Sequence, residues 1–260
     1  MKLPMLSIAP IVLFLGVTML CAQSSANEGE VPLRLFESSR FPVLSLASSH
    51  SNFSFVVGNQ FFIREMTTEE FVAKVRHKPH LFLLSCRHEG WSKFGELRSQ
   101  VGYGLQVTPH LAFALQFIYL LHHARNYSSL HSITFDFSLW AKVNAKSGIL
   151  LYAYNSAYLH YGIVGKSPIP VELKTMFYYH IHKDFSLCAQ FCKMIPGGFD
   201  FELSGLLALR SIVFRGAFSL RSISLECSLR WNKFRFAFAT YFDYRVGFSQ
   251  RTACHYFYIR

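Results

Sequence analysis

From about residue 95 to the C-terminus, the chain consists of successive segments in which every second side chain is apolar. Neighbouring side chains of a β-strand point to opposite faces, so this pattern predicts strands with one apolar face and one polar face. Between Ile133 and Ala141 the odd positions are Ile, Phe, Phe, Leu and Ala, whereas Thr, Asp and Ser occupy three of the four even ones. The same code recurs over residues 171–182, 185–192, 199–207, 212–220, 223–231 and 234–242. Such repetition is typical of a transmembrane β-barrel.

The breaks between these segments are short and rich in turn-forming residues, as at Thr108-Pro109, Pro196-Gly197-Gly198 and Asn232-Lys233. Longer polar stretches, such as residues 123–129 and 161–170, alternate with them, as the outer loops of a barrel alternate with its short periplasmic turns. Weaker strand candidates lie at residues 53–57, 60–63, 70–76, 80–86 and 94–107. We therefore expect an all-β, antiparallel, up-and-down transmembrane barrel over residues 51–260, with about fourteen strands in a range of about 12 to 16.

The composition narrows the alternatives to two. Apolar residues make up 51% of the chain and charged residues only 16%, which is too apolar for an ordinary soluble domain. After residue 22, however, no run approaches the ~20 apolar residues of a membrane-spanning helix. The longest run, Leu111 to Leu121, is interrupted by Gln116. A large secreted β-sandwich remains as the alternative to a barrel, but the many Phe and Tyr residues at the apolar positions favour the barrel.

The N-terminus has the layout of a secretory signal peptide. Met1-Lys2-Leu3 is followed by a compact apolar stretch that ends near Leu20, and Ser24-Ser25-Ala26 supplies small residues for cleavage. We expect residues 1–26 to be the signal peptide, with cleavage after Ala22 as the alternative. A lipoprotein signal at Cys21 is disfavoured because Leu20, which precedes it, is not small. Residues 27–50 are then a short N-terminal segment or partial plug, and the expected location is the bacterial outer membrane.

The net charge of +11 has a simple interpretation in an exported barrel. No recognition motif accompanies the basic residues, so nucleic acid is not an expected partner. Basic loops that face outer-membrane lipid and lipopolysaccharide explain the charge, and the barrel assembly machinery and another envelope complex are the other expected partners. The five cysteines after the signal region are an odd number without the dense spacing of a disulfide scaffold.

Two sets of residues are the candidate site. The polar positions of the alternating segments are expected to face the lumen, and they carry both signs of charge: Asp136, Lys142, Glu172, Lys174, Asp200, Glu202, Arg215, Glu226, Arg230 and Arg235. Because selective pores present rings of one charge, this mixture favours a closed or gated barrel over an open porin. Aromatic residues near segment ends are expected at the membrane interfaces: Phe177, Tyr179, Trp231, Phe242, Tyr256 and Tyr258.

Metal and catalytic sites are not expected. His180 and His182 are two residues apart on one predicted strand, where their imidazoles would share a face. A metal site would need a third donor, such as His160, Glu172 or Asp200, and nothing in the sequence requires one. Serine and histidine are abundant, but no spacing identifies a nucleophile and its base. We therefore expect no cofactor, no metal and no catalytic residues.

Several motifs resemble those of a known group of barrels. Asn59-Gln60-Phe61-Phe62-Ile63-Arg64-Glu65-Met66-Thr67 is similar to the "N-R-F-x-L-K-E-L-S" segment of Bacteroidetes outer-membrane barrels of the PorV/PorQ type, which act in type IX secretion and are remotely similar to long-chain fatty-acid transport barrels. Val101-Gly102-Tyr103-Gly104 with residues 108–116 resembles a hairpin of that group, and residues 247–256 resemble its last strand. The resemblance covers residues about 50 to 260 and implies a barrel with a transport or secretion role.

Two departures from the group concern the chain ends. Residues 27–52 do not reproduce the "N-P-A" motif that packs helices into the barrel mouth of larger relatives, so we expect a short plug or none. Many outer-membrane barrels end on an aromatic residue, whereas this chain continues past Tyr258 to Ile259-Arg260. The function expected first is a non-enzymatic transport component or an accessory of an envelope complex, with type IX secretion as a candidate. The alternatives are a porin-like channel for small solutes or hydrophobic compounds and, third, a membrane-embedded lipid hydrolase.

Overall fold

The computed structural model describes residues 51–60, 67–91, 93–126, 129–155, 159–161 and 167–258. The expected signal peptide and the expected N-terminal segment, residues 1–50, lie outside the described residues. In this part of the chain no helix is long and apolar enough to cross a membrane. The strands of the main sheet are β1 (Ser51–Gln60), β2 (Thr67–His77), β3 (His80–Gly90), β4 (Phe94–Thr108), β5 (Leu111–Ala124), β6 (Leu130–Lys142), β7 (Ser147–Tyr154), β10 (Val171–His182), β11 (Phe185–Ile195), β12 (Phe199–Leu209), β13 (Ile212–Ser219), β14 (Ser222–Trp231), β15 (Phe234–Asp243) and β16 (Gly247–Tyr258).

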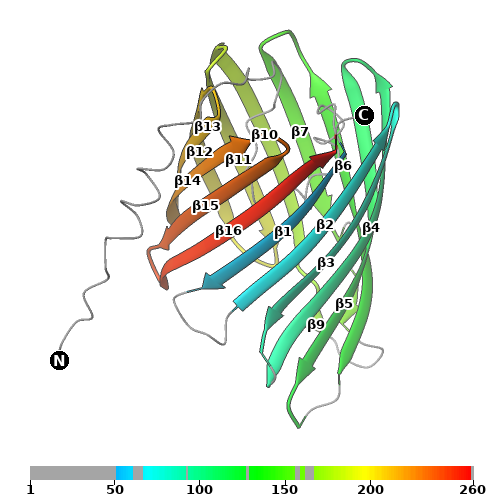
Figure 1. The fold of residues 1–260 in the computed structure, drawn as a ribbon. Coiled ribbons are helices and arrows are strands. Elements are labelled where there is room, and N and C mark those ends of the chain that lie inside the picture. The colour runs from blue at the N-terminus through cyan, green and yellow to red at the C-terminus, as the bar shows by residue number, and fades with distance from the viewer. Residues whose placement is uncertain are drawn as a thin grey trace, which may run out of the picture.

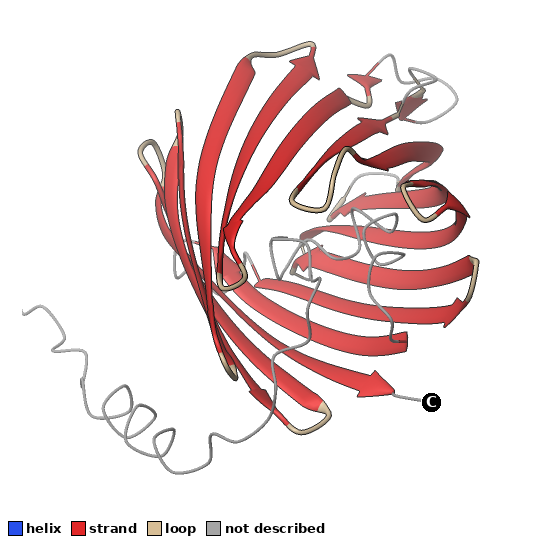
Figure 2. Ribbon diagram, turned by 90° about the horizontal axis from the view of Figure 1, so that it is seen from above, coloured by secondary structure: helices blue, strands red, loops and turns tan. Residues whose placement is uncertain are grey.

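These fourteen strands close into an antiparallel barrel (Figures 1 and 2). Each strand pairs with its neighbours in the chain, and β1 pairs with β16 from Ser51–Tyr258 to Gln60–Ser249. A small second sheet, β8 (His160–Tyr161) with β9 (Ser167–Pro168), lies in the connection between β7 and β10. The closed all-β barrel and the expected number of strands are thus confirmed, and no strand of the barrel is left with an unpaired edge.

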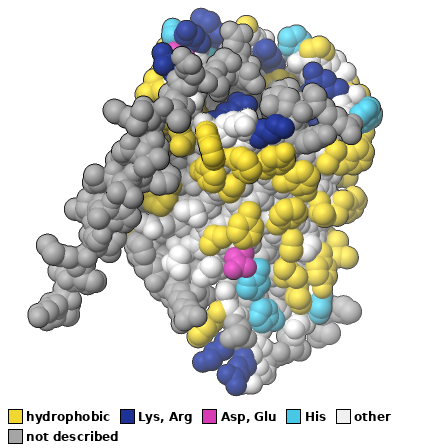
Figure 3. All heavy atoms as spheres, in the orientation of Figure 1, with side chains coloured by type: hydrophobic (Ala, Val, Ile, Leu, Met, Phe, Trp, Pro, Cys, Tyr) yellow, Lys and Arg dark blue, Asp and Glu magenta, His cyan; other side chains and the backbone are white. Residues whose placement is uncertain are grey.

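The alternation of the sequence corresponds to the two faces of the barrel wall. Outward residues such as Ile133 and Leu225 expose 64% and 65% of their surface, whereas the adjacent Thr134 and Glu226 are buried. In Figure 3, apolar side chains spread over much of the visible outer wall, and Lys and Arg side chains gather along its upper rim. An exposed apolar surface of this extent is unfavourable in water, so this outer wall fits the hydrocarbon core of a bilayer.

Strands β5 and β7 do not alternate between apolar and polar residues, because their inward side chains are mostly apolar too. On β5 the inward residues Ala112, Ala114, Ile118 and Leu120 are buried, and on β7 the inward Leu150 is buried as well. Both faces of these strands are therefore apolar over most of their length, which hides the alternation. The separate strand expected at residues 60–63 is not observed as such, because β1 ends at Gln60 and residues 61–66 lie outside the described part.

The two ends of the barrel differ in their connections. We call the end that holds Ser51 and Tyr258, at the top of Figure 1, the terminal end, and the opposite one the loop end. The turns at the terminal end are tight, as between His77 and His80, Thr108 and Leu111, or Trp231 and Phe234. The longest connection, between Tyr154 and Val171, lies at the loop end. In outer-membrane barrels the short turns are periplasmic, which would place the terminal end in the periplasm.

Candidate functional site

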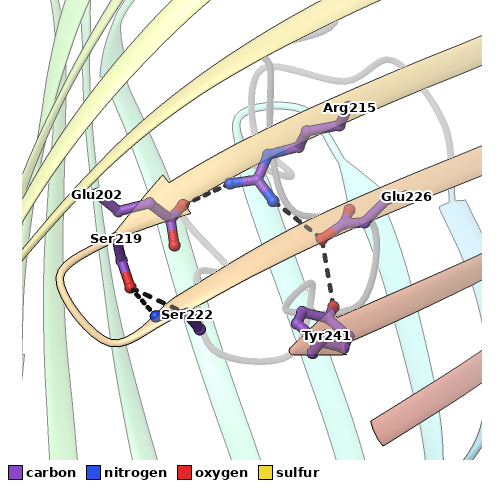
Figure 4. Close-up of polar contacts among 6 residues, drawn as sticks. All are labelled: Glu202, Arg215, Ser219, Ser222, Glu226 and Tyr241. Atoms are coloured by element: carbon purple, nitrogen blue, oxygen red, sulfur yellow. Dashed lines mark hydrogen bonds and ion pairs between the residues drawn. The ribbon is translucent and has the colours of Figure 1, made fainter. Parts of the chain in front are cut away.

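The candidate site is the inner wall of the barrel, where polar side chains of neighbouring strands form ion pairs. Arg215 on β13 donates from Nη2 to Oε1 of Glu202 on β12 at 2.6 Å and from Nη1 to Oε1 of Glu226 on β14 at 2.9 Å. The Tyr241 hydroxyl on β15 donates to the same Glu226 oxygen at 3.2 Å, so four consecutive strands are joined (Figure 4). Next to them, the Arg251 guanidinium of β16 lies 5.4 Å from the centre of the Tyr241 ring.

A pocket of about 240 Å³ opens beside this network, at the loop end of β10 to β15. Lys174 contacts Glu172 at 2.9 Å, and the Cys192 thiol donates to Glu172 at 3.4 Å. The pocket is lined by acids and bases together with small polar groups: Glu172, Lys174, Gln190, Cys192, Met194, Gly198, Asp200, Glu202, Ser219, Arg221, Ser222 and Asp243. Such a lining can hold water and polar solutes.

A third polar group lies on the inner wall across the lumen from this network, on β4, β6 and β7. Asp136 on β6 is buried, accepts a 2.7 Å hydrogen bond from the Tyr152 hydroxyl and lies 3.5 Å from the Arg98 guanidinium of β4. The same guanidinium lies 4.8 Å from the centre of the Tyr154 ring. Sequence reasoning named Asp136 but missed Arg98, because the pattern in residues 94–107 is broken by glycine and polar residues on both faces.

Apolar side chains cover the interior toward the terminal end of β3 to β11. Trp140, Tyr152, Met176 and Tyr178 are buried there in one cluster with Leu81, Ala112, Ala114, Leu150 and Cys188. The Tyr178 ring lies directly on Gly148, where an added Cβ would be 2.6 Å from ring atoms. Glycine at this position is what allows the ring to lie against the wall.

Every residue of the expected lumen set lies at an inward position of its strand. Asp136, Lys174, Glu202, Arg215, Glu226 and Arg235 are buried, and Lys142, Glu172, Asp200 and Arg230 are partly buried. They do not form one site. Glu202, Arg215 and Glu226 are in one network, Glu172, Lys174, Asp200 and Glu202 line the pocket, and Lys142, Arg230 and Arg235 lie near the terminal end.

Five of the six expected interface aromatics face outward, but at different depths. Trp231 and Tyr256 lie close to the terminal end and Phe242 close to the loop end, whereas Phe177 is five residues inside the end of β10. Phe177, Tyr179 and Trp231 are exposed, and Phe242 and Tyr256 are partly buried. The side chain of Tyr258 lies outside the described set.

The two histidines considered for a metal site diverge. The Nδ1 atom of His180 is 2.6 Å from the Ser186 hydroxyl, whereas the Nδ1 atom of His182 is 3.6 Å from Asp184 in the turn. A register shift between the two residues breaks the shared face on which the pairing depended. In the described ranges, no group of three or more His, Cys, Asp or Glu is placed to hold a metal ion. The side chain of His160 is outside those ranges.

Comparison with solved structures identifies barrels of the same shape. The chain is similar to the CymD monoaromatic hydrocarbon channel, with a TM-score of 0.61 and 10% identity, over 92% of this chain and 100% of that chain. It is also similar to the Pseudomonas putida toluene transporter TodX, with a TM-score of 0.61 and 8% identity, over 89% of this chain and 94% of that chain. No protein-family model matches the sequence, and no curated protein sequence matches it. At these identities the similarity shows the barrel fold alone.

Proposed function

We propose that the chain forms a channel of the bacterial outer membrane that passes small solutes through the barrel lumen. The observation that carries this proposal is the contrast between the two faces of the wall. The outer face is apolar, whereas the inner face holds ion pairs, hydroxyl groups and a polar pocket at the loop end. A polar inner wall inside a closed barrel provides a water-compatible route across a bilayer.

The solutes that fit this lumen are small molecules with both a polar and an apolar part. The inner wall of β12 to β14 carries the ion pairs of Arg215, and the inner wall of β6, β7 and β10 carries the Trp140, Tyr152 and Tyr178 rings. CymD and TodX are described as a hydrocarbon channel and a toluene transporter, which supports a transport role for a barrel of this shape. The location in the outer membrane, with the terminal end in the periplasm, is part of the same proposal.

The accessory role in an envelope complex, including type IX secretion, ranks below a channel. It depends on the resemblance of the sequence motifs, and no contact in the described residues favours it. Binding of lipopolysaccharide and of the barrel assembly machinery likewise stays a prediction.

Liposome swelling tests the channel. Purified protein in liposomes should accelerate swelling in isotonic solutions of small solutes, such as a pentose or a small aromatic acid, relative to protein-free liposomes. The rate should fall as solute size increases. If no solute of any size enters, and the protein is instead recovered from native outer membrane in a stoichiometric complex, the channel is refuted and the accessory role is supported.

A further inference from the structure

The outer wall carries basic and aromatic side chains at the loop end of β3 to β5. On β5 the outward apolar residues run from Phe113 to Leu121. His123 and Arg125 follow them toward the loop end. Strands rise about 3.4 Å per residue and tilt by about 40°, so this apolar run spans roughly 20 Å of the membrane normal, close to the ~25 Å apolar band of a barrel. His123 and Arg125 therefore lie at the edge of that band, at the level of lipid headgroups.

Two basic side chains are next to each other at this edge. Lys93 precedes β4 and Arg125 follows β5, and the Arg125 amide donates to the Lys93 carbonyl at 2.6 Å, which continues the pairing of the two strands. Both side chains are exposed, and the alternation of their strands directs them to the outer face. The Lys93 ammonium lies 5.1 Å from the centre of the exposed Trp91 ring. Trp together with Lys or Arg is typical of a membrane interface.

Two imidazole rings extend this surface from β5 to β3. The rings of His88 and His123 are stacked, with 6.4 Å between their centres and an interplanar angle of 12°. Gly95 on the intervening strand β4 leaves room for this contact, because an added Cβ would lie 2.5 Å from Cε1 of His123. The Nε2 atom of His123 lies 3.3 Å from the Trp91 carbonyl oxygen, which joins the ring to the turn before β4. In Figure 3, His side chains lie low on the visible outer wall, below most of its apolar side chains.

Acidic side chains are placed away from the two cations. Among the acids described on β2 to β6, Glu69 is the one that faces outward, and it is directly opposite His88. Strands β3 and β4 separate it from β5, so at ~4.8 Å per strand it lies about 14 Å from the strand of Arg125, beyond a Debye length. Glu89 and Glu96 face the lumen and contact basic side chains there. The outer edge of β4 and β5 is therefore positive.

We propose that this basic patch binds a phosphate group of lipopolysaccharide, the phosphorylated glycolipid of the outer leaflet, through Lys93, Arg125, His88 and His123. Ammonium and guanidinium groups form charge-assisted hydrogen bonds with phosphate oxygens, and imidazole N–H groups add further donors. The acyl chains of the same lipid lie against exposed apolar side chains such as Phe117, further inside the membrane. The inference goes beyond the proposed channel and shares with it only the assignment of the loop end to the outside.

Binding in detergent tests the site without requiring transport or a membrane orientation. Bisphosphorylated lipid A, the probe, is titrated into the purified full-length chain, and the bound fraction is measured by native mass spectrometry. We expect Lys93→Gln/Arg125→Gln to bind the probe about tenfold or more weakly, and Lys93→Arg/Arg125→Lys to retain binding. The matched control is Lys193→Gln/Arg245→Gln, which removes two exposed positive charges at the same end, on the side of β11 and β16, and should leave the affinity unchanged.

Fully dephosphorylated lipid A separates the phosphate groups from the acyl chains as the source of binding. The wild type and Lys93→Gln/Arg125→Gln should bind this second probe equally weakly. Equal affinity of the two proteins for bisphosphorylated lipid A would overturn the site, and so would the same loss of affinity in Lys193→Gln/Arg245→Gln. Liposome swelling should be unchanged in Lys93→Gln/Arg125→Gln. Absence of swelling in the wild type, with lipid A binding present, would instead overturn the channel and leave the site intact.

Discussion

Arg215 illustrates how a single residue can organise the inner wall. It lies between two glutamates of neighbouring strands, and the three side chains are almost fully buried. Removal of one member of a buried ion pair typically costs about 3–5 kcal/mol, because the partner charges remain buried. We expect Arg215→Met to lower the free energy of unfolding by about that amount, measured by urea titration in lipid vesicles. The triple variant that adds Glu202→Gln and Glu226→Gln should recover most of the loss. An unchanged urea midpoint for Arg215→Met would contradict the network.

Leu225 tests the orientation of a strand at the level of one side chain. It exposes 65% of its surface on the outer wall, so Leu225→Arg would place a charge in lipid. The expected loss is about 2–4 kcal/mol near the membrane midplane. Ser224, its inward neighbour, is only 4% exposed and is too enclosed to be a clean control. Ser222→Arg is better matched, because Ser222 lines the polar pocket opposite Asp243. Equal losses for the two variants would contradict the assignment of the faces.

At the scale of the element, alternation in the sequence predicted the strands that have an apolar outer face and a polar inner face. Residues 223–231 alternate cleanly because Leu225 faces outward and Glu226 inward. The strands β5 and β7 were not recognised, because Ile118, Leu120 and Leu150 make the inner wall apolar as well. The sequence also could not predict that His180 and His182 point apart, because a local register shift between β10 and β11 causes it.

The connection between β7 and β10 is held to the inner wall by Asn155. Its side chain accepts from the Thr134 hydroxyl at 2.8 Å and donates to the Ile169 carbonyl at 2.8 Å, and it accepts from the Leu159 amide at 2.9 Å. Ile169 packs with Ile118 and Leu120 in a small buried cluster. Asn155 is therefore the residue that joins both described parts of this connection to β6.

Asn155→Ala should destabilise this connection more than the barrel. Loss of these buried hydrogen bonds is expected to cost about 1–3 kcal/mol locally. Amide hydrogen exchange should accelerate at Leu159 and Ile169, while the amides of β12 to β15 keep their wild-type protection. The control Asn144→Ala removes a hydrogen bond to the Lys146 amide in an exposed turn and should not change exchange at Ile169. Uniform acceleration in all strands would show that Asn155 supports the barrel as a whole instead.

At the scale of the whole molecule, the charge balance of the lumen differs from what its composition indicates. The inward set named from the sequence contains five acids and five bases, and this mixture favoured a closed or gated barrel. The structure pairs part of this set, Arg215 with Glu202 and Glu226 and Lys174 with Glu172. Other members lie at opposite ends of the barrel, with Arg230 and Arg235 at the terminal end and Asp200 at the loop end. The sequence could not show this, because the distance of a residue from the rim depends on where each turn falls.

The apolar interior leads to the last prediction, which concerns conductance. Trp140, Tyr152 and Tyr178 are buried on the inner wall, so their rings fill space that ions would otherwise occupy. We therefore expect the wild-type protein in a planar bilayer to show little steady conductance, with brief openings. Trp140→Ala/Tyr178→Ala should increase single-channel conductance severalfold by removing two rings from the lumen. Phe177→Ala is the matched control, because Phe177 is adjacent in sequence but faces outward. A large, stable open state of the wild type would contradict the obstructed lumen and favour an open porin.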